Sequence, residues 1–118
     1  MKLLTLAIST AISALVAGAA DAQGRSGINC ISYEGPNSGQ VVHGTICRTG
    51  GADAWQEINN SNANPIRWQE TAEAPGRVTL FDASRSYTLI IDANAHQILV
   101  KRNPTDTFHF LYSISSVQ

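Results

Sequence analysis

Residues 77–101, RVTLFDASRSYTLIIDANAHQILVK, decide the fold because apolar and polar residues alternate along them in three successive runs. Successive side chains of a β-strand point to opposite faces, so a period of two predicts half-buried strands and not a helix. Two short clusters, residues 82–85 and 92–95, separate the runs and are rich in residues that form tight turns. Short connectors require antiparallel neighbours, so this stretch predicts a three-stranded meander.

The start of the chain has the features of a secretory signal peptide over residues 1–22. Lys2 gives a basic start, residues 3–16 are mostly apolar, and the small-x-small pattern at 20–22 is typical of a signal-peptidase site. Serine and threonine interrupt the apolar run, which is also too short for a membrane span. We expect cleavage after Ala22 and export to the periplasm or the medium of a bacterium.

The remaining residues, 23–118, are of a length that forms one domain with one modest core. The formal net charge of the chain is −1, which gives no electrostatic reason to expect binding to nucleic acid or to an anionic membrane surface. We expect a monomer or a weakly associating protein without a cofactor.

Two cysteines, Cys30 and Cys47, lie on either side of a turn-forming segment, Gly-Pro-Asn-Ser-Gly at residues 35–39. The flanking runs predict a hairpin with one cysteine on each arm. A metal site is a poorer alternative because no Cys-x-x-Cys or Cys/His spacing accompanies them. Because exported proteins form disulfides, we predict a Cys30–Cys47 bond worth about 3 kcal/mol.

The chain contains one short internal repeat: Trp-Gln-Glu at residues 55–57 recurs at 68–70, with a polar loop between the copies. The period is too short for a solenoid repeat, so it indicates neighbouring strands with similar faces. Residues 71–76 are predicted as a loop. In a last strand, Phe108, Phe110 and Tyr112 alternate with His109 and Leu111 and are expected to share a face. The whole predicts an all-β fold, a small antiparallel meander of about eight short strands closing into a sandwich or barrel, with one disulfide.

Glu57 and Glu70 form the obvious carboxylate pair for a small hydrolase, because glycoside hydrolysis uses two carboxylates across a cleft. The alternative, which we favour, places each glutamate at a strand rim, solvated or paired with Arg77 or Arg85. A chain of this size has little room for a pocket, so we expect no enzyme. The histidines lack metal-ligand spacing, and His109 is expected to be exposed.

Four aromatic residues, Trp55, Trp68, Tyr33 and Tyr87, are candidates for an exposed platform that binds a sugar or a partner protein. The alternative, which we favour for the tryptophans, is that they fill the core of a domain short of large apolar side chains. The cluster at residues 82–85 is expected to be a turn in which Asp82 caps the backbone and Arg85 pairs with Asp82 or Asp92.

Residues 44–58, GTICRTGGADAWQEI, resemble the Gly-Thr-x-Cys-Arg…Trp segment near the end of bacterial 17 kDa surface antigens, with Cys30 upstream. Those proteins are usually lipid-anchored, whereas this chain has no lipid-attachment cysteine after its small residues. The pattern W-x-E, V-x-L-x-D-x-S-R, I-I-D from Trp55 onward also resembles short β modules of small exported bacterial proteins without assigned function. Neither resemblance implies catalytic residues.

The sequence therefore favours an exported, non-catalytic binding or envelope-associated protein, such as an inhibitor or adaptor of an unknown protein or glycan partner. The first alternative is a carbohydrate-binding module that uses Trp55 or Trp68 together with Glu57 or Glu70. The second is a small hydrolase that uses the two glutamates.

Overall fold

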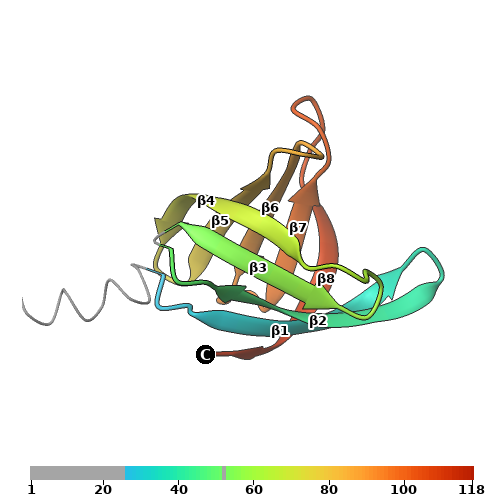
Figure 1. Ribbon diagram of the computed structural model, residues 1–118, viewed down its shortest axis with the longest axis horizontal. Coiled ribbons are helices and arrows are strands. Elements are labelled where there is room, and N and C mark those ends of the chain that lie inside the picture. Colours follow the sequence, from blue (N-terminus) through green and yellow to red (C-terminus); the bar gives the residue numbers. More distant parts are fainter. Residues whose placement is uncertain (1–25, 52) are drawn as a thin grey trace, which may run out of the picture.

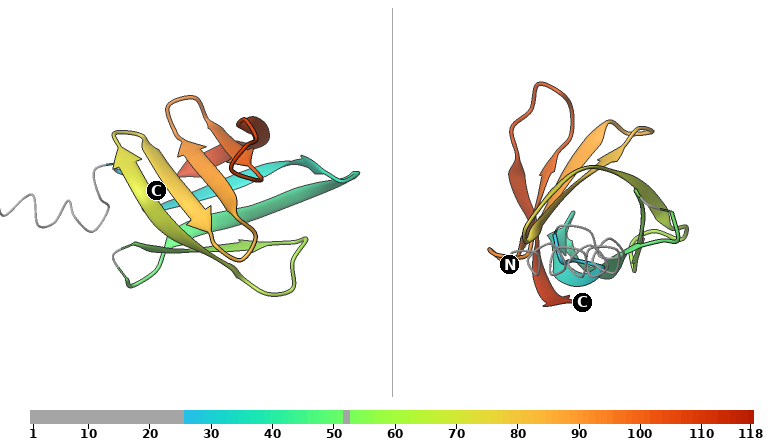
Figure 2. Two further views of the ribbon diagram at one scale, coloured as in Figure 1. Left: turned by 90° about the horizontal axis from the view of Figure 1, so that it is seen from above. Right: turned by 90° about the vertical axis from the view of Figure 1, so that its left-hand side faces the viewer.

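The computed structural model describes residues 26–51 and 53–118, so the expected signal peptide at 1–22 lies outside the described residues. The described chain forms eight antiparallel strands that close into a barrel, each paired with its neighbours in sequence and β1 paired with β8 (Figures 1 and 2). The predicted all-β meander is confirmed, and it closes as a barrel. The strands are β1 (Cys30–Asn37), β2 (Gln40–Arg48), β3 (Ala54–Asn59), β4 (Ile66–Ala74), β5 (Arg77–Asp82), β6 (Tyr87–Asp92), β7 (Gln97–Lys101) and β8 (His109–Val117).

Strands β5, β6 and β7 are the predicted meander, and its first turn is built as expected. Asp82 accepts hydrogen bonds from the backbone N–H of Ser84 at 3.0 Å and from its hydroxyl at 2.7 Å. Arg85 Nε donates to Asp82 Oδ2 at 2.6 Å, so its partner is Asp82 and not Asp92. The turn at the start of β6 is therefore fixed by side chains of the turn itself.

The core lies inside the barrel and consists of the inward-facing side chains of the strands. Trp55 and Trp68 belong to it, with exposed fractions of 1% and 5%, which confirms that the tryptophans are core residues. The other buried apolar members are Ile28, Ile31, Tyr33, Val42, Ile46, Val78, Leu80, Leu89, Ile91, Ile98, Val100, Tyr112 and Ile114.

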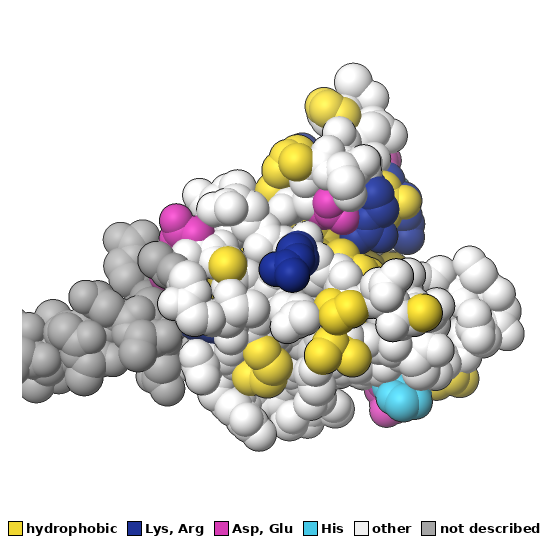
Figure 3. Space-filling model, viewed as in Figure 1, with side chains coloured by type: hydrophobic (Ala, Val, Ile, Leu, Met, Phe, Trp, Pro, Cys, Tyr) yellow, Lys and Arg dark blue, Asp and Glu magenta, His cyan; other side chains and the backbone are white. Residues whose placement is uncertain are grey.

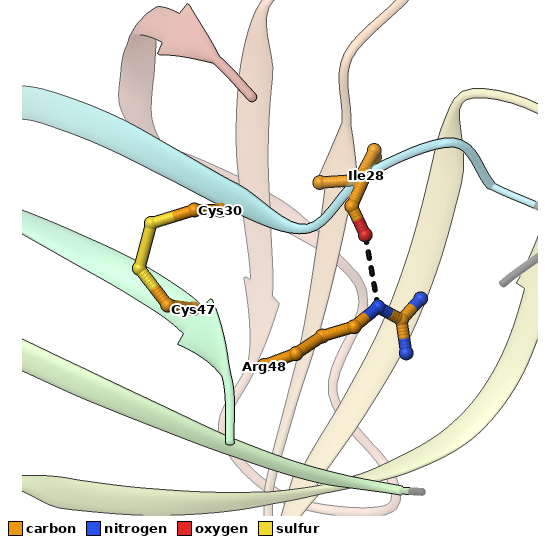
Figure 4. Close-up of a disulfide and its surroundings, with 4 residues drawn as sticks. All are labelled: Ile28, Cys30, Cys47 and Arg48. Carbon is orange, nitrogen blue, oxygen red and sulfur yellow. Dashed lines mark hydrogen bonds between the residues drawn. A yellow bond between two sulfur atoms is a disulfide. The ribbon is translucent and has the colours of Figure 1, made fainter. Parts of the chain in front are cut away.

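The predicted disulfide joins Cys30 to Cys47, which lie directly opposite each other in the β1–β2 pair (Figure 4). Their neighbours Ile31 and Ile46 are also paired and are buried inside the barrel. Because side chains alternate along a strand, the cysteines lie on the outer face of the hairpin. The disulfide thus links β1 to β2 outside the barrel and leaves the core to apolar packing.

Strand β4 extends further than the sequence indicated, because residues 71–74 belong to it and not to a loop. The register with β5 shifts between Glu70 and Ala72, which leaves Thr71 as an extra residue in a bulge. Residues three apart in a regular strand face opposite sides, but the bulge turns Glu70 and Glu73 to the same side. The bulge reverses which of the following side chains face inward without interrupting the strand, and alternation alone did not predict it.

The prediction for the last strand is wrong because β8 contains a second bulge. Phe110 and Tyr112 were expected to share a face, yet Phe110 is 57% exposed and Tyr112 is buried at 6%. Tyr112 pairs with Ile98 and Phe110 with Leu99, so Leu111 is the extra residue. The extra residue reverses which side chains face inward beyond it, and β8 contributes to the core only from Leu111 onward.

The two ends of the barrel carry different connections. One end holds the β2–β3, β4–β5 and β6–β7 turns together with Ser26 and Gln118, the first and last described residues. The other end holds the β3–β4, β5–β6 and β7–β8 loops and the long β1–β2 hairpin, which projects beyond the barrel (Figure 1). Residues 26–51 and 53–118 contain no helix with the length and hydropathy that a membrane crossing needs.

Candidate functional site

The repeated Trp-Gln-Glu sequence forms a reciprocal pair across β3 and β4. Trp55 lies directly opposite Trp68, and the strands run in opposite directions. Trp68 Nε1 donates to Glu57 Oε1 at 2.9 Å, and Trp55 Nε1 donates to Glu70 Oε1 at the same distance. Each copy thus supplies the glutamate that satisfies the other copy's indole. Because the strands are antiparallel, one glutamate lies toward each end of the barrel.

The expectation that the two glutamates sit at strand rims near Arg77 or Arg85 is wrong. Glu57 is 5% exposed and faces the interior, and the cation that binds Glu70 is Arg48. Both glutamates follow a buried tryptophan by two positions, so strand alternation turns them inward. The backbone N–H of Glu70 bonds to Asp53, four positions from Glu57, which corresponds to roughly 13 Å along the strands. The two tryptophans therefore separate the two carboxylates.

The end of the barrel that contains Glu70 is closed by Arg48. Its guanidinium bonds to Glu70 at 2.9 Å and to Glu73 at 2.7 Å. Figure 4 shows its third bond, from Nε to the carbonyl of Ile28 at 2.9 Å. The same group stacks on the ring of Trp55, 4.5 Å from its centre. The side chains of Arg48, Glu70 and Glu73 are 7%, 11% and 12% exposed, so this is a buried network of paired charges.

The segment before β1 completes this closure. The backbone N–H of Ser26 donates to Glu73 at 3.3 Å, and the carbonyl of Ser26 accepts from Gly76 in the β4–β5 turn at 2.9 Å. Ile28 is 1% exposed and packs in the core. We call this end, defined by Ser26, Ile28, Arg48, Glu70 and Glu73, the closed end.

The opposite end, which we call the open end, contains a cavity of about 100 Å³. Glu57, Trp68 and Tyr112 contribute polar groups to it, while Arg85 and Arg102 line it from the loops. In Figure 3 the surface is indented between the β1–β2 hairpin and the upper ends of β6 to β8, with lysine or arginine side chains beside the indentation. The remaining lining residues are Asn37, Ile46, Asn59, Ser61, Asn62, Ile66, Tyr87, Leu89, Ile98, Val100 and Leu111.

Glu57 is held by neutral donors only. Its Oε2 accepts hydrogen bonds from the Tyr33 hydroxyl and from Asn59 Nδ2, the latter at 3.0 Å, in addition to the Trp68 bond on Oε1. Within residues 26–51 and 53–118, no lysine, arginine or histidine forms an ion pair with it. A carboxylate offers about four acceptor sites, so three donors leave one site on Oε1.

Two tyrosines stack beside this carboxylate, with ring centres 4.5 Å apart. Burial, followed by the negative charge of Glu57, raises the pKa of Tyr33 well above its usual range. Burial also raises the pKa of Tyr112, against a hydrogen bond from Asn37 Nδ2 of 2.9 Å. Both phenols are therefore protonated donors. Because the Tyr112 oxygen accepts from Asn37, its own proton is available to a ligand.

Arginines and an aromatic ring form the mouth of the cavity. The Arg85 guanidinium lies 4.4 Å from the ring centre of Tyr87 and 5.5 Å from that of Trp68, and it is also paired with Asp82. The Arg102 guanidinium lies 5.9 Å from the ring centre of Tyr87, and Arg102 is exposed. No carboxylate of the described chain pairs with Arg102. The mouth thus has one neutralised and one available positive charge.

Of the four residues that the sequence suggested for ligand binding, the structure brings Trp68 and Glu57 to the cavity. Trp55 and Glu70 belong to the closed end, where each is engaged by the other or by Arg48. The aromatic candidates do not form an outer platform, because Tyr33 is 1% exposed and both tryptophans are buried. The repeated Trp-Gln-Glu sequence was the signal that pointed to the right strands.

Several residues of the site were missed by sequence reasoning. Asn37 and Asn59 end their strands and resemble turn formers, while Arg102 belongs to a loop and Tyr112 was expected to share a face with Phe110. The chain was expected to have little room for a pocket, and the cavity is small, about 100 Å³. An eight-stranded barrel encloses an interior about wide enough for packed side chains or one small ligand. Here side chains fill most of it and leave this cavity at the open end.

No group of three histidine, cysteine or acidic side chains in residues 26–51 and 53–118 is placed to hold a metal ion. Comparison of the chain with protein-family models, with curated proteins and with solved structures finds no match. The chemistry of the site therefore has to be argued from its own side chains.

Proposed function

We propose that this protein is an exported binding protein that takes a small ligand into the open end of its barrel and does not catalyse a reaction. The observation that carries the proposal is the difference between the ends. Arg48 and the segment before β1 fill one end, while the other retains a cavity of about 100 Å³ into which Glu57, Trp68 and Tyr112 converge. Convergence of a few polar groups on a largely apolar pocket is typical of ligand sites.

The size of the cavity limits the ligand. A cavity of about 100 Å³ holds roughly four non-hydrogen atoms, scaled from the six of benzene in a cavity of about 150 Å³. Drug-sized molecules need pockets of roughly 300 Å³ or more. The ligand is therefore a very small molecule or the terminal group of a larger one, such as a glycan or a peptide.

Export is part of the same proposal. The Cys30–Cys47 disulfide is compatible with an oxidising compartment outside the cytoplasm. The basic, apolar and small-residue pattern of residues 1–22 supports delivery there. Whether the protein works in the periplasm or in the medium follows from fractionating cells that express the full chain and detecting the protein in each fraction.

A pair of isoleucine variants tests the binding site. Ile66 is half-buried and lines the cavity, whereas Ile58 on the adjacent strand is 57% exposed on the outer face. Ile66→Trp is expected to fill the cavity and to abolish binding of small molecules, screened in pools by ligand-observed NMR. Ile58→Trp adds the same bulk outside and is expected to leave binding unchanged. If no pool contains a ligand, or if both variants bind as the wild type does, the proposal is wrong.

A further inference from the structure

We infer that the ligand is a small zwitterion whose protonated amine binds at Glu57 and whose anionic group faces Arg102, as in a small amino acid. This inference rests on the proposed function and names the chemistry of the same site. It follows from the two charges that the cavity leaves without a partner, one at its base and one at its mouth.

The charge at the base is the carboxylate of Glu57. It is 5% exposed and receives hydrogen bonds from Tyr33, Asn59 and Trp68, all of them neutral. Moving a carboxylate out of water is costly unless an opposite charge compensates, and neutral donors recover only part of that cost. A cationic group that enters the cavity supplies the missing charge. At the closed end, Arg48 does the same for Glu70 at 2.9 Å.

Hydrogen-bonding capacity favours an amine over a quaternary ammonium group. Oε1 of Glu57 accepts only the indole N–H of Trp68 and retains one acceptor site. A protonated amine has N–H donors that fit this site, and a charge-assisted bond of this kind is stronger than a neutral one. The rings of Trp68, Tyr87 and Tyr112 also line the cavity, and aromatic faces attract cations.

The charge at the mouth is the guanidinium of Arg102. Arg85 is already paired with Asp82 at 2.6 Å, whereas Arg102 pairs with no carboxylate in the described part of the chain. Guanidinium binds carboxylates through paired N–H donors, so an anionic group at the mouth is well matched. Both arginines line the same cavity as Glu57.

Simpler ligand classes satisfy only part of this arrangement. A simple anion meets the negative charge of Glu57, a simple cation leaves Arg102 without a partner, and a neutral sugar leaves both charges without a partner. A small amino acid has roughly five to eight non-hydrogen atoms, so its amine end fits the cavity while its carboxylate stays at the mouth beside Arg102. Charge and size therefore favour the same class.

Isothermal titration calorimetry of the full exported protein provides the test. Glycine, alanine, serine and valine are the zwitterionic probes, with methylamine, acetate and glucose as cationic, anionic and neutral comparisons. At least one amino acid is expected to bind with a micromolar to millimolar dissociation constant, about tenfold or more tighter than any comparison probe. Binding of glucose or acetate alone, abolished by Ile66→Trp, would overturn the zwitterion inference while supporting the proposed function.

Arg102→Gln removes the charge at the mouth and leaves that of Glu57 in place. It is expected to preserve the fold because the residue is exposed in a loop. It is expected to weaken amino-acid binding about tenfold, the value of a lost charged hydrogen bond. Arg77→Gln, an exposed arginine away from the cavity, is the matched control and is expected to change nothing. Equal affinities in these two variants would overturn the inference. Glu57→Gln, checked for folding by circular dichroism, is expected to abolish binding.

Discussion

The two ends of the barrel use the same Trp-Gln-Glu sequence to different effect. At the closed end, Glu70 accepts the indole of Trp55 and binds Arg48 at 2.9 Å. At the open end, Glu57 accepts the indole of Trp68 and meets only further neutral donors beside a cavity of about 100 Å³. The difference is where the compensating cation comes from. The chain supplies it at one end, and at the other we propose that a ligand does.

This difference also divides stability from function. The closed end joins the segment before β1, β2 and β4 through one guanidinium, so we expect most of the large energetic effects there. The open end has exposed loops, and the side-chain bonds that join its strands are between neutral donors and Glu57 or Tyr112. Loops at the end of a rigid barrel are the usual place for binding residues, because the scaffold tolerates their variation.

Arg48→Met is expected to have the largest effect on stability. It leaves Glu70 and Glu73 buried without their cation, and breaking a buried ion pair in this way costs about 3–5 kcal/mol. Urea unfolding followed by tryptophan fluorescence measures the loss. Arg77→Met, at an exposed position, is the control and is expected to cost little. A loss below about 1 kcal/mol for Arg48→Met would show that the closed end is not sealed by charge.

Replacing both cysteines, as Cys30→Ala with Cys47→Ala, is expected to cost about 3 kcal/mol through the larger entropy of the unfolded chain. The two residues are separated by 17 positions. Cys30 is the first residue of β1, and Cys47 directly precedes Arg48 in β2. Urea unfolding of wild type and variant gives the difference. Because the disulfide is outside the barrel, ligand affinity at the open end is expected to stay the same, and a parallel loss of affinity would contradict the separation of the two ends.

Tyr33→Phe removes one donor from the buried carboxylate of Glu57 and is expected to cost about 1–3 kcal/mol at neutral pH. Tyr87→Phe, at the half-buried mouth, is the matched control and is expected to cost less. Equal costs for the two variants would indicate that the Tyr33 hydroxyl does not stabilise the carboxylate.

The same tyrosine predicts a dependence on alkaline pH. Burial and the charge of Glu57 raise the pKa of Tyr33, so the folded state keeps a proton that the unfolded state loses above about pH 10. Stability is therefore full below that pH and falls as the pH rises further. Unfolding free energies measured between pH 8 and pH 11 are expected to fall less steeply for Tyr33→Phe than for the wild type.

Asp82→Asn in the β5–β6 turn is expected to have the smallest effect, about 1 kcal/mol or less at pH 7, because Arg85 is exposed. Burial raises the pKa of Asp82, but hydrogen bonds from Ser84 and Arg85 outweigh it and lower the pKa overall. The carboxylate therefore stabilises the fold above its unfolded pKa of about 3.9, and this is lost as the pH falls through the lower folded value. Urea midpoints of variant and wild type should converge in acid; a constant gap would contradict this.

The parts of the fold that depend on local pattern were predictable. Alternation gave β5 to β7, the turn residues gave their connections, and the placement of Cys30 and Cys47 on two arms of a hairpin gave the disulfide. The repeated tryptophan motif predicted that β3 and β4 present similar faces, and they pair at Trp55 and Trp68. Each of these features involves residues that are close in sequence or linked by one short turn.

The parts that depend on bulges and on barrel closure were not predictable in this way. The extra residues Thr71 and Leu111 change the inward face within a strand, which placed Glu73 beside Arg48 and turned Phe110 outward. The contact between Tyr33 and Glu57 joins β1 to β3 across the interior, a separation that alternation does not encode. The cavity depends on how all strands close together, so its residues could be found only in the folded chain.

The most direct test of the difference between the two ends uses the only two tryptophans of the chain. In a ¹H–¹⁵N spectrum of labelled protein, the indole of Trp68 reports on Glu57 and the open end, and that of Trp55 reports on Glu70 and the closed end. Titration with pools of amino acids, sugars and small organic acids is expected to move the Trp68 signal while the Trp55 signal stays in place. Two unmoved signals in every pool, or a shift of the Trp55 signal alone, would contradict the account.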